Sequence, residues 1–170
     1  IDLLVTTTVL QGGFTGVAKK EVADVPVLGQ LLSLAEFAFL DRSDGAQARV
    51  ALDGAAARLA KGTSIVISPE GTRSLTPSVG PFKKGGFHLA MQAGVPIVPI
   101  VIRNAGELMW RAAKTARSGT VEVFVHEPIS TTGWTKQDLD AAVDRVQRLY
   151  VDTLEDWPDS ASEPLNDVRK

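Results

Sequence analysis

The chain contains no cysteine and only two histidines, His88 and His126. Without cysteine there is no disulfide, thiol nucleophile or cysteine metal ligand, and two histidines argue against a zinc site built from several of them. The formal net charge of -2 gives no overall attraction to nucleic acid or to anionic lipid. No apolar run approaches the roughly 20 residues that span a bilayer, and no signal-peptide pattern is present. We therefore expect no metal and no nucleic-acid partner, and any attraction for anions must come from a local basic patch.

The composition is that of a folded domain, with 44% apolar and 22% charged residues. We expect one domain over residues 1–157 and a disordered polar tail over 158–170, where turn-forming and acidic residues gather. The chain opens with Ile1 and Asp2, without a methionine and in the middle of a pattern. We interpret the domain as lacking its N-terminal part.

Short apolar and β-branched runs predict strands. Residues 64–67 indicate a buried strand, and residues 121–125 alternate as in a half-exposed one. Residues 95–102 are apolar but contain two prolines, so this strand must lie at an edge or pair only in part. Residues 14–18 and 37–40 are weaker candidates.

Helical patterns lie between these strands. Residues 46–61 are alanine-rich and end at Lys61-Gly62, residues 87–92 are closed by Gly94, and a capping box at 135–138 opens a longer helix. One face of that last helix carries Leu139, Val143, Val146, Tyr150 and Leu154. Strands alternating with helices predict an α/β layered domain with a largely parallel central sheet flanked by helices.

The most informative stretch is Ser-Pro-Glu-Gly-Thr-Arg-Ser at residues 68–74. It directly follows the strand expected at 64–67, which is where α/β proteins place ligand-binding loops. Gly71 permits a close backbone approach or a positive φ, and the Arg73 guanidinium matches the geometry of phosphate oxygens. The stretch is a candidate phosphate site; a turn with a solvated arginine is the alternative.

Two further cations, Lys83 and Lys84, come shortly before a helix whose N-terminal N–H groups favour anions. The surrounding lysine-glycine loop lacks the Gly-Lys-Ser/Thr ending of a P-loop, which argues against a nucleotide site. A solvated lysine-rich loop is the simpler alternative.

Five short sequence blocks, one of them the stretch at 68–74, follow one another in the chain: residues 17–21, 25–29, 39–42, 68–74 and 95–100. This set resembles the glycerolipid acyltransferase family of the lysophosphatidate acyltransferase (PlsC) type. The family's blocks run histidine-four residues-aspartate, Phe-x-x-Arg, Phe-Pro-Glu-Gly-Thr-Arg-Ser and Val-Pro-Ile-Val-Pro-Val. The resemblance extends from Asp2 to about Ile102, roughly the first three-fifths of the chain.

The resemblance implies a set of residues that bind the phosphate and glycerol of the acceptor: Lys19, Lys20, Arg42, Glu70, Gly71, Thr72 and Arg73. Lys83 and Lys84 fall in the family's Phe-Lys-x-Gly segment, which makes them candidates for a contact with the acceptor or with the thioester donor. Residues 95–100 match a block that supports the acyl site, and a core strand is the alternative. Ser68 and Glu36 depart from the family's phenylalanine and glycine, which leaves the identity of the acceptor open.

The first block implies the catalytic pair. Asp2 falls at the aspartate of the histidine motif, and its histidine is expected five positions earlier, outside the chain. Asp2 would orient that imidazole, and an N-terminal helix cap is the alternative. Neither His88 nor His126 is followed by an acid at the motif spacing, so we interpret both as structural or surface residues.

By resemblance, the expected function is transfer of a fatty acyl group from acyl-CoA or acyl carrier protein to 1-acyl-sn-glycerol 3-phosphate, forming phosphatidate. No cofactor is implied. The partners are the lysophospholipid, the acyl carrier and the membrane surface. The expected location is the cytoplasmic face of the cell membrane, peripheral or anchored by a segment not in this chain. Two alternatives stay open: a non-catalytic lipid-phosphate binding domain, and an acyltransferase acting on another lysolipid or on glycerol 3-phosphate.

Overall fold

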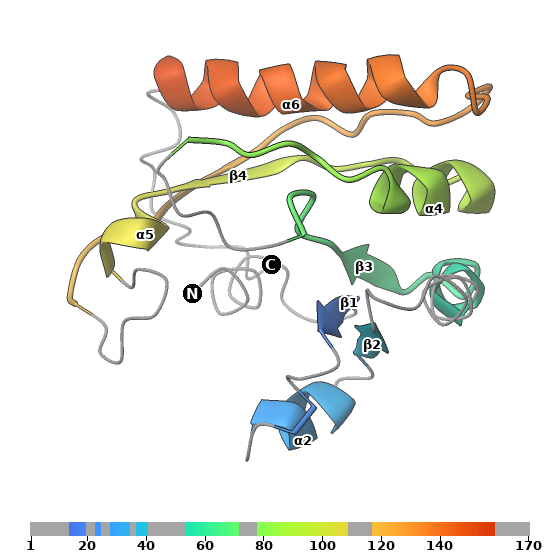
Figure 1. Ribbon diagram of the computed structural model, residues 1–170, viewed down its shortest axis with the longest axis horizontal. Helices are drawn as coiled ribbons and strands as arrows, with labels where there is room; N and C mark the ends of the chain where they lie inside the picture. Colours follow the sequence, from blue (N-terminus) through green and yellow to red (C-terminus); the bar gives the residue numbers. More distant parts are fainter. Residues whose placement is uncertain are drawn as a thin grey trace, which may run out of the picture.

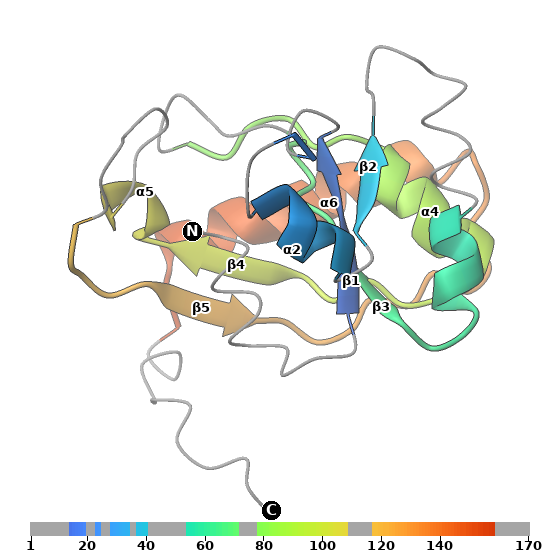
Figure 2. The ribbon, with the colours of Figure 1, turned by 90° about the horizontal axis from the view of Figure 1, so that it is seen from below.

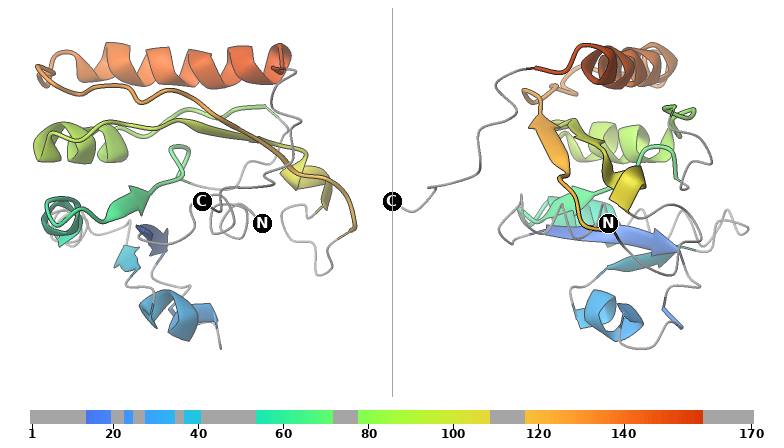
Figure 3. Two further views of the ribbon diagram at one scale, coloured as in Figure 1. Left: turned by 180° about the vertical axis from the view of Figure 1, so that it is seen from behind. Right: turned by 90° about the vertical axis from the view of Figure 1, so that its left-hand side faces the viewer.

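The structure is a computed structural model that describes residues 14–19, 23–24, 28–34, 37–40, 54–71, 78–108 and 117–158. Its elements lie in layers (Figure 1). An outer helix, α6, covers α4 and the strand β4; a small parallel sheet follows, with α2 on the far side. Figure 3 shows the same order of layers from behind and from one side. The α/β layered architecture expected from the sequence is therefore confirmed.

Three strands form the parallel sheet, β1 (Phe14–Lys19), β2 (Ala38–Leu40) and β3 (Ser64–Val66). Their order is β2-β1-β3, with β1 in the middle and parallel to both neighbours (Figure 2). All three segments were predicted as strands. The expectation that the third would be buried was wrong, because Ile65 and Val66 are only partly covered and Ser64 is exposed.

The proline-containing run forms a strand only in its second half. β4 (Ile100–Arg103) begins immediately after Pro99 and pairs antiparallel with β5 (Glu122–Val125). Upstream of it, Ile97 makes only an isolated bridge to Ile129. Partial pairing was predicted from the two prolines, each of which lacks the N–H that a ladder requires.

The helices end where the sequence predicts. In α4 (Gly85–Ala93) the chain leaves the helix through Gly94, whose φ of 65° is left-handed and whose N–H reaches the carbonyls of Ala90 and Met91. Residues 54–59 are helical and are followed by Gly62 at a φ of 84°. The first part of that expected helix, 46–53, lies outside the described residues. Two short helices were not predicted, α2 (Leu28–Leu34) and α5 (Ala105–Leu108).

The core lies between α4 and α6 (Leu139–Glu155). Its buried members are Phe82, Phe87, Leu139, Val143 and Val146. The Asp138 carboxylate accepts the Thr135 backbone N–H at 2.8 Å, as in the predicted capping box, but this contact lies in the turn before α6. The helix itself begins at Leu139, and its N-cap residue Asp138 makes no side-chain cap hydrogen bond. The hydrogen bond from the Thr135 hydroxyl, and then the one from its backbone N–H, lower the pKa of Asp138. The predicted apolar face of α6 is therefore the face that builds the core.

Candidate functional site

The candidate site lies where the three parallel strands end. Lys19, the last residue of β1, is level with Leu40, the last residue of β2. Val66 at the end of β3 is level with Gly16 on the other side of β1. Because the strands are parallel, the segments that follow them leave the same edge of the sheet.

The strand order strengthens this placement. After β1 the chain passes to one side to form β2 and then crosses to the other side of β1 to form β3. Open α/β sheets bind ligands beside the carboxyl ends of strands at such a reversal. The reversal here lies between β1 and β3, the strands that precede the lysine pair and the Glu-Gly-Thr-Arg segment.

Half of the residues predicted for the site can be placed. Asp2, Lys20, Arg42, Thr72 and Arg73 lie outside the described residues. Lys19 is placed as the C-terminal residue of β1. Glu70 and Gly71 lie in the turn after β3, and Lys83 and Lys84 lie immediately before α4. The roles assigned to these ten residues stay predictions.

The turn after β3 is closed by backbone hydrogen bonds. The Gly71 N–H donates to the Ser68 carbonyl at 3.1 Å, and Gly71 has a φ of 69° that suits glycine. The Pro69 carbonyl accepts the Lys83 N–H at 2.7 Å. The loop that starts the Glu-Gly-Thr-Arg motif is therefore joined to the lysine-glycine loop ahead of α4.

The Glu70 side chain adds a second link between the same two loops. Its Oε2 accepts the Gly80 N–H at 3.2 Å, while the Gly80 carbonyl accepts the Gln147 Nε2–H of α6 at 3.0 Å. Sequence reasoning did not identify Gly80 or Gln147. The available signals were weak: Gly80 stands before a proline in a turn-rich segment, and Gln147 is one polar residue beside the apolar face of α6.

The two lysines before α4 have different surroundings. Lys84 forms an ion pair with Asp140 in the first turn of α6, with both side chains more than half exposed. Lys83 is exposed, and its side chain has no ion pair with any residue that the structure describes. The exposed ion pair of Lys84 with Asp140 contributes little stability. Among the residues that the structure describes, Lys83 therefore has no acidic partner, whereas Lys84 has one.

The segment matched to the fourth block, 95–100, divides between core and surface. Pro99 is fully buried, as is Val101 just beyond the block, whereas Val98 is 45% exposed. Pro99 is therefore part of the core, as the alternative interpretation of this block expects. Val98 is directed away from that core.

The His126 side chain contacts a hydroxyl of α6. His126 Nε2 lies 2.8 Å from Thr153 Oγ1, and the Thr153 hydroxyl donates to the Leu149 carbonyl at 2.6 Å. Burial lowers the pKa of His126. This setting agrees with the structural role predicted for it, and His88 lies partly buried in α4.

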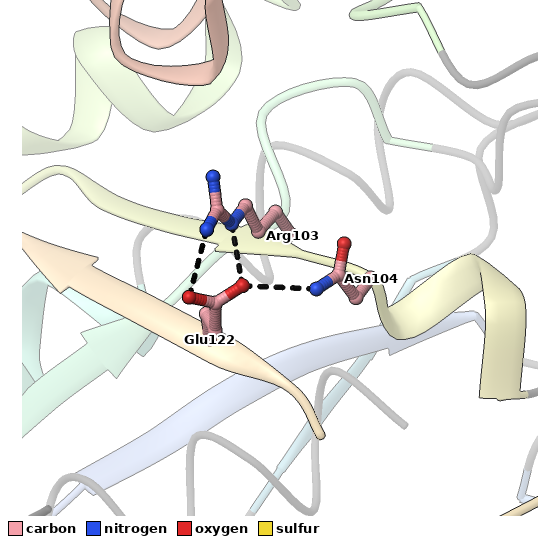
Figure 4. A network of polar contacts seen from close by, with 3 residues as sticks. All are labelled: Arg103, Asn104 and Glu122. Carbon is pink, nitrogen blue, oxygen red and sulfur yellow. Dashed lines mark hydrogen bonds and ion pairs between the residues drawn. The ribbon is translucent and has the colours of Figure 1, made fainter. Parts of the chain in front are cut away.

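A network of polar side chains lies where β4 ends and β5 begins (Figure 4). Arg103 donates to both oxygens of Glu122, at 2.6 and 2.8 Å, and the Asn104 amide donates to Glu122 at 2.9 Å. The hydrogen bond from Arg103 is the main cause that lowers the pKa of Glu122. The Arg103 guanidinium also lies 4.4 Å from the centre of the Trp157 ring. The network links the end of β4 to the segment that follows α6.

The described part of the chain offers neither a metal site nor a membrane-spanning helix. Among the described residues, no group of three or more His, Cys, Asp or Glu is placed to hold a metal ion. Within the same ranges, no helix has the length and apolar character to cross a bilayer.

Comparisons with known proteins agree on one family. A family model described as "Acyltransferase" matches residues 1–103. The chain is 36% identical over 156 residues to a 1-acyl-sn-glycerol-3-phosphate acyltransferase of Cocos nucifera, covering 91% of this chain and 50% of that protein. It is 37% identical over 148 residues to the human 1-acyl-sn-glycerol-3-phosphate acyltransferase alpha, covering 86% of this chain and 52% of that protein.

A solved structure has the same fold. The crystal structure of the 1-acyl-sn-glycerophosphate acyltransferase of Thermotoga maritima superposes with a TM-score of 0.70 and 28% sequence identity. The match covers 85% of this chain and 58% of that one. The chain thus spans about half the length of the curated relatives it matches.

Proposed function

Because this chain belongs to the acyltransferase family, we propose that the protein transfers a fatty acyl group to the free hydroxyl of 1-acyl-sn-glycerol 3-phosphate, forming phosphatidate. The donor is acyl-CoA or acyl carrier protein. The observation that carries the proposal is the strand register, in which three of the motif-bearing segments leave one edge of the parallel sheet. Several relatives are named for this reaction.

Acceptor binding is assigned to the cations that follow the strands. Lys19 is the last residue of β1 and Lys20 is the next residue in sequence, while Arg42 comes after β2 in the sequence and Arg73 after β3. Their charges complement the acceptor phosphate, and the guanidinium groups can bind two of its oxygens at once. Holding the phosphate here fixes the position of the acceptor hydroxyl. Such positioning contributes about 7–11 kcal/mol in well-oriented systems.

Chemistry at the hydroxyl needs a base, and we assign it to a histidine five positions before Asp2. The hydroxyl oxygen attacks the thioester carbonyl carbon as the imidazole takes its proton. Collapse of the tetrahedral intermediate breaks the carbon–sulfur bond and releases the thiol of the carrier. Asp2 would hold the imidazole in the correct tautomer and stabilise the imidazolium. No covalent acyl-enzyme is needed, which fits the absence of a Gly-x-Ser-x-Gly motif.

The acceptor and product are membrane lipids, so the site must meet a bilayer surface. We assign the protein to the cytoplasmic face of the membrane, held peripherally or by a segment outside this chain. The basis of this assignment is that the acceptor and the product are lipids that stay in the bilayer.

The experiment is an acyl-transfer assay of the full-length protein with lysophosphatidate and acyl-CoA, following both phosphatidate formation and thiol release. The variant with the upstream histidine changed to alanine should bind vesicles normally and lose about 10²–10⁴-fold in kcat. Vesicle binding is the control, because it separates loss of the base from loss of membrane attachment.

Three outcomes would contradict the proposal. Phosphate binding without thiol release would indicate the non-catalytic domain. A higher kcat/KM with glycerol 3-phosphate or another lysolipid would replace the acceptor. Full activity in the alanine variant would mean that the base is elsewhere and that Asp2 is a helix cap.

A further inference from the structure

Gly80 is held on both sides by side chains from distant parts of the chain. Its N–H is bound by Glu70 and its carbonyl by Gln147, which are 10 and 67 residues away in sequence. We call these three residues the Gly80 bridge. Both hydrogen bonds are partly buried, and both fix the point where the chain returns from the Glu-Gly-Thr-Arg segment.

We propose that Glu70 and Gln147 are positioning residues for acceptor binding, and that they act through Gly80. Glu70 fixes the segment where it leaves β3, and the bridge ties its return to α6. Arg73 follows Gly71 by two residues, so a displacement of the turn is passed to the arginine through the chain. The inference rests on the proposed function, since it assigns Arg73 to the acceptor phosphate.

The chemistry of Glu70 favours this indirect role. A carboxylate beside an acceptor phosphate would repel it, whereas the same oxygen is a good acceptor for a backbone N–H. The fit is close: a Cβ placed on Gly80 would lie 2.7 Å from Glu70 Oε2. The carboxylate therefore occupies the space that a side chain at position 80 would need.

Gln147 supplies the rigid end of the bridge. Its neighbour in α6, Val146, is 3% exposed, and Val143 one turn earlier is 6% exposed. Both belong to the core cluster with Phe82 and Phe87, so this part of α6 has little freedom to shift. The bridge thereby fastens a loop of the candidate site to the core. Gln147 itself lies beyond the residues matched by the family model, 1–103.

Glu70 is tested by comparing Glu70→Ala with Glu70→Gln in the full-length protein. The glutamine keeps an oxygen that can accept the Gly80 N–H, so it should retain most activity, whereas alanine should lower kcat/KM for lysophosphatidate by up to about 100-fold. The KM for acyl-CoA should not change in either variant, because the bridge acts on the acceptor side. Equal loss in both variants would overturn the proposal, since it would mean that the carboxylate charge acts on the substrate directly.

Gly80→Ala is a second, independent way to lower kcat/KM for lysophosphatidate. The new methyl group displaces the Glu70 carboxylate, so this variant should behave like Glu70→Ala. In the double variant the obstructing carboxylate is absent, and Gly80→Ala should then cause no further loss. Additive losses would overturn the coupling between the two residues.

Gln147→Glu is the test on α6, because it preserves shape and removes the N–H donor. The matched control is Gln92→Glu, the same change at an exposed position of α4. Gln147→Glu should weaken acceptor use, and the control should not. Equal behaviour of the two would remove Gln147 from the proposal.

Hydrogen exchange separates failure of the bridge from failure of the proposed function. The Gly80 amide should exchange about tenfold faster in Glu70→Ala than in Glu70→Gln. That difference is measurable whether or not the protein transfers acyl groups. If the Gly80 amide exchanges no faster in Glu70→Ala, the hydrogen bond from Gly80 to Glu70 is not formed and the bridge is refuted. If the exchange rate changes as expected but the protein transfers no acyl group, only the proposed function is refuted.

Discussion

At the scale of single residues, the neighbours of His126 fix which of its ring nitrogens donates a hydrogen bond. The Thr153 hydroxyl donates to the Leu149 carbonyl, so its oxygen is left to accept the His126 Nε2–H. This arrangement requires a proton on Nε2, which both the neutral Nε2–H tautomer and the imidazolium carry. Burial favours the neutral form, because it lowers the pKa of His126.

The pH dependence of stability follows from that shift. In the unfolded chain the histidine takes up a proton near its ordinary pKa of about 6.5, while the folded protein resists protonation. The unfolded state therefore binds more protons below that pH, and stability should fall as pH is lowered through about 6.5. Urea unfolding at about pH 8 and about pH 5 should show a smaller loss of stability in His126→Gln than in the wild type. An identical loss in both would contradict the assignment.

At the scale of elements, α6 is held to the rest of the fold mainly by its apolar face. Leu139 at its start is 2% exposed and belongs to the core cluster with Phe82 and Phe87. Tyr150 near its other end has a ring contact with Phe82 and accepts the Ile100 N–H at 3.2 Å. The helix therefore joins the segment before α4 to the strand β4.

Removing one of these side chains should be costly. Leu139→Ala leaves a cavity in the core and should lower the free energy of unfolding by about 2–5 kcal/mol. Leu34→Ala is the matched control, since Leu34 is 81% exposed on α2 and its loss should change stability by less than about 0.5 kcal/mol. Chemical denaturation of both variants gives the comparison. Similar values would place Leu139 outside the cooperative core.

Most elements were predictable because their side-chain pattern or their end signals are local. The period of α6, the glycine after α4 and the prolines in the run before β4 each act within a few residues. The short helices α2 and α5 were missed, because seven and four residues are too few to show a period. The burial of β3 was misjudged, because an apolar run does not report how completely its neighbours cover it.

At the scale of the whole molecule, the candidate site depends on segments that only the sheet brings together. The Glu-Gly-Thr-Arg segment was predictable from sequence as a candidate site, since it follows a run that forms the strand β3. The order β2-β1-β3 was not, and neither was the contact of Gln147 with Gly80. Both depend on long-range packing that leaves no local pattern.

One prediction belongs to the sheet as a whole. If Arg42 and Arg73 share the phosphate site, alanine at either position should weaken binding of inorganic phosphate and raise the acceptor KM. Arg73→Lys should be nearly as poor as Arg73→Ala, because an ammonium cannot reproduce two parallel guanidinium hydrogen bonds. Phosphate titration and steady-state kinetics of the full-length protein provide the measurements.

The matched control for that experiment is Arg148→Ala, which removes an exposed arginine from α6. It should leave phosphate affinity unchanged. A phosphate-bound structure with Arg42 and Arg73 on opposite faces would exclude a shared site.

The strand order also has a consequence for how the chain folds. The central strand β1 cannot complete its pairing until β3 has been synthesised, because Phe14 pairs with Ser64. The Gln147 contact with Gly80 closes still later, across 67 residues of sequence. Contacts between residues so far apart in sequence form slowly, because the chain loses the entropy of closing the loop before the contact contributes any stabilisation. During synthesis the edge of the sheet that carries the candidate site is therefore assembled in stages. The hydrogen bond from Gln147 to Gly80 forms last, after the helix α6 has been synthesised.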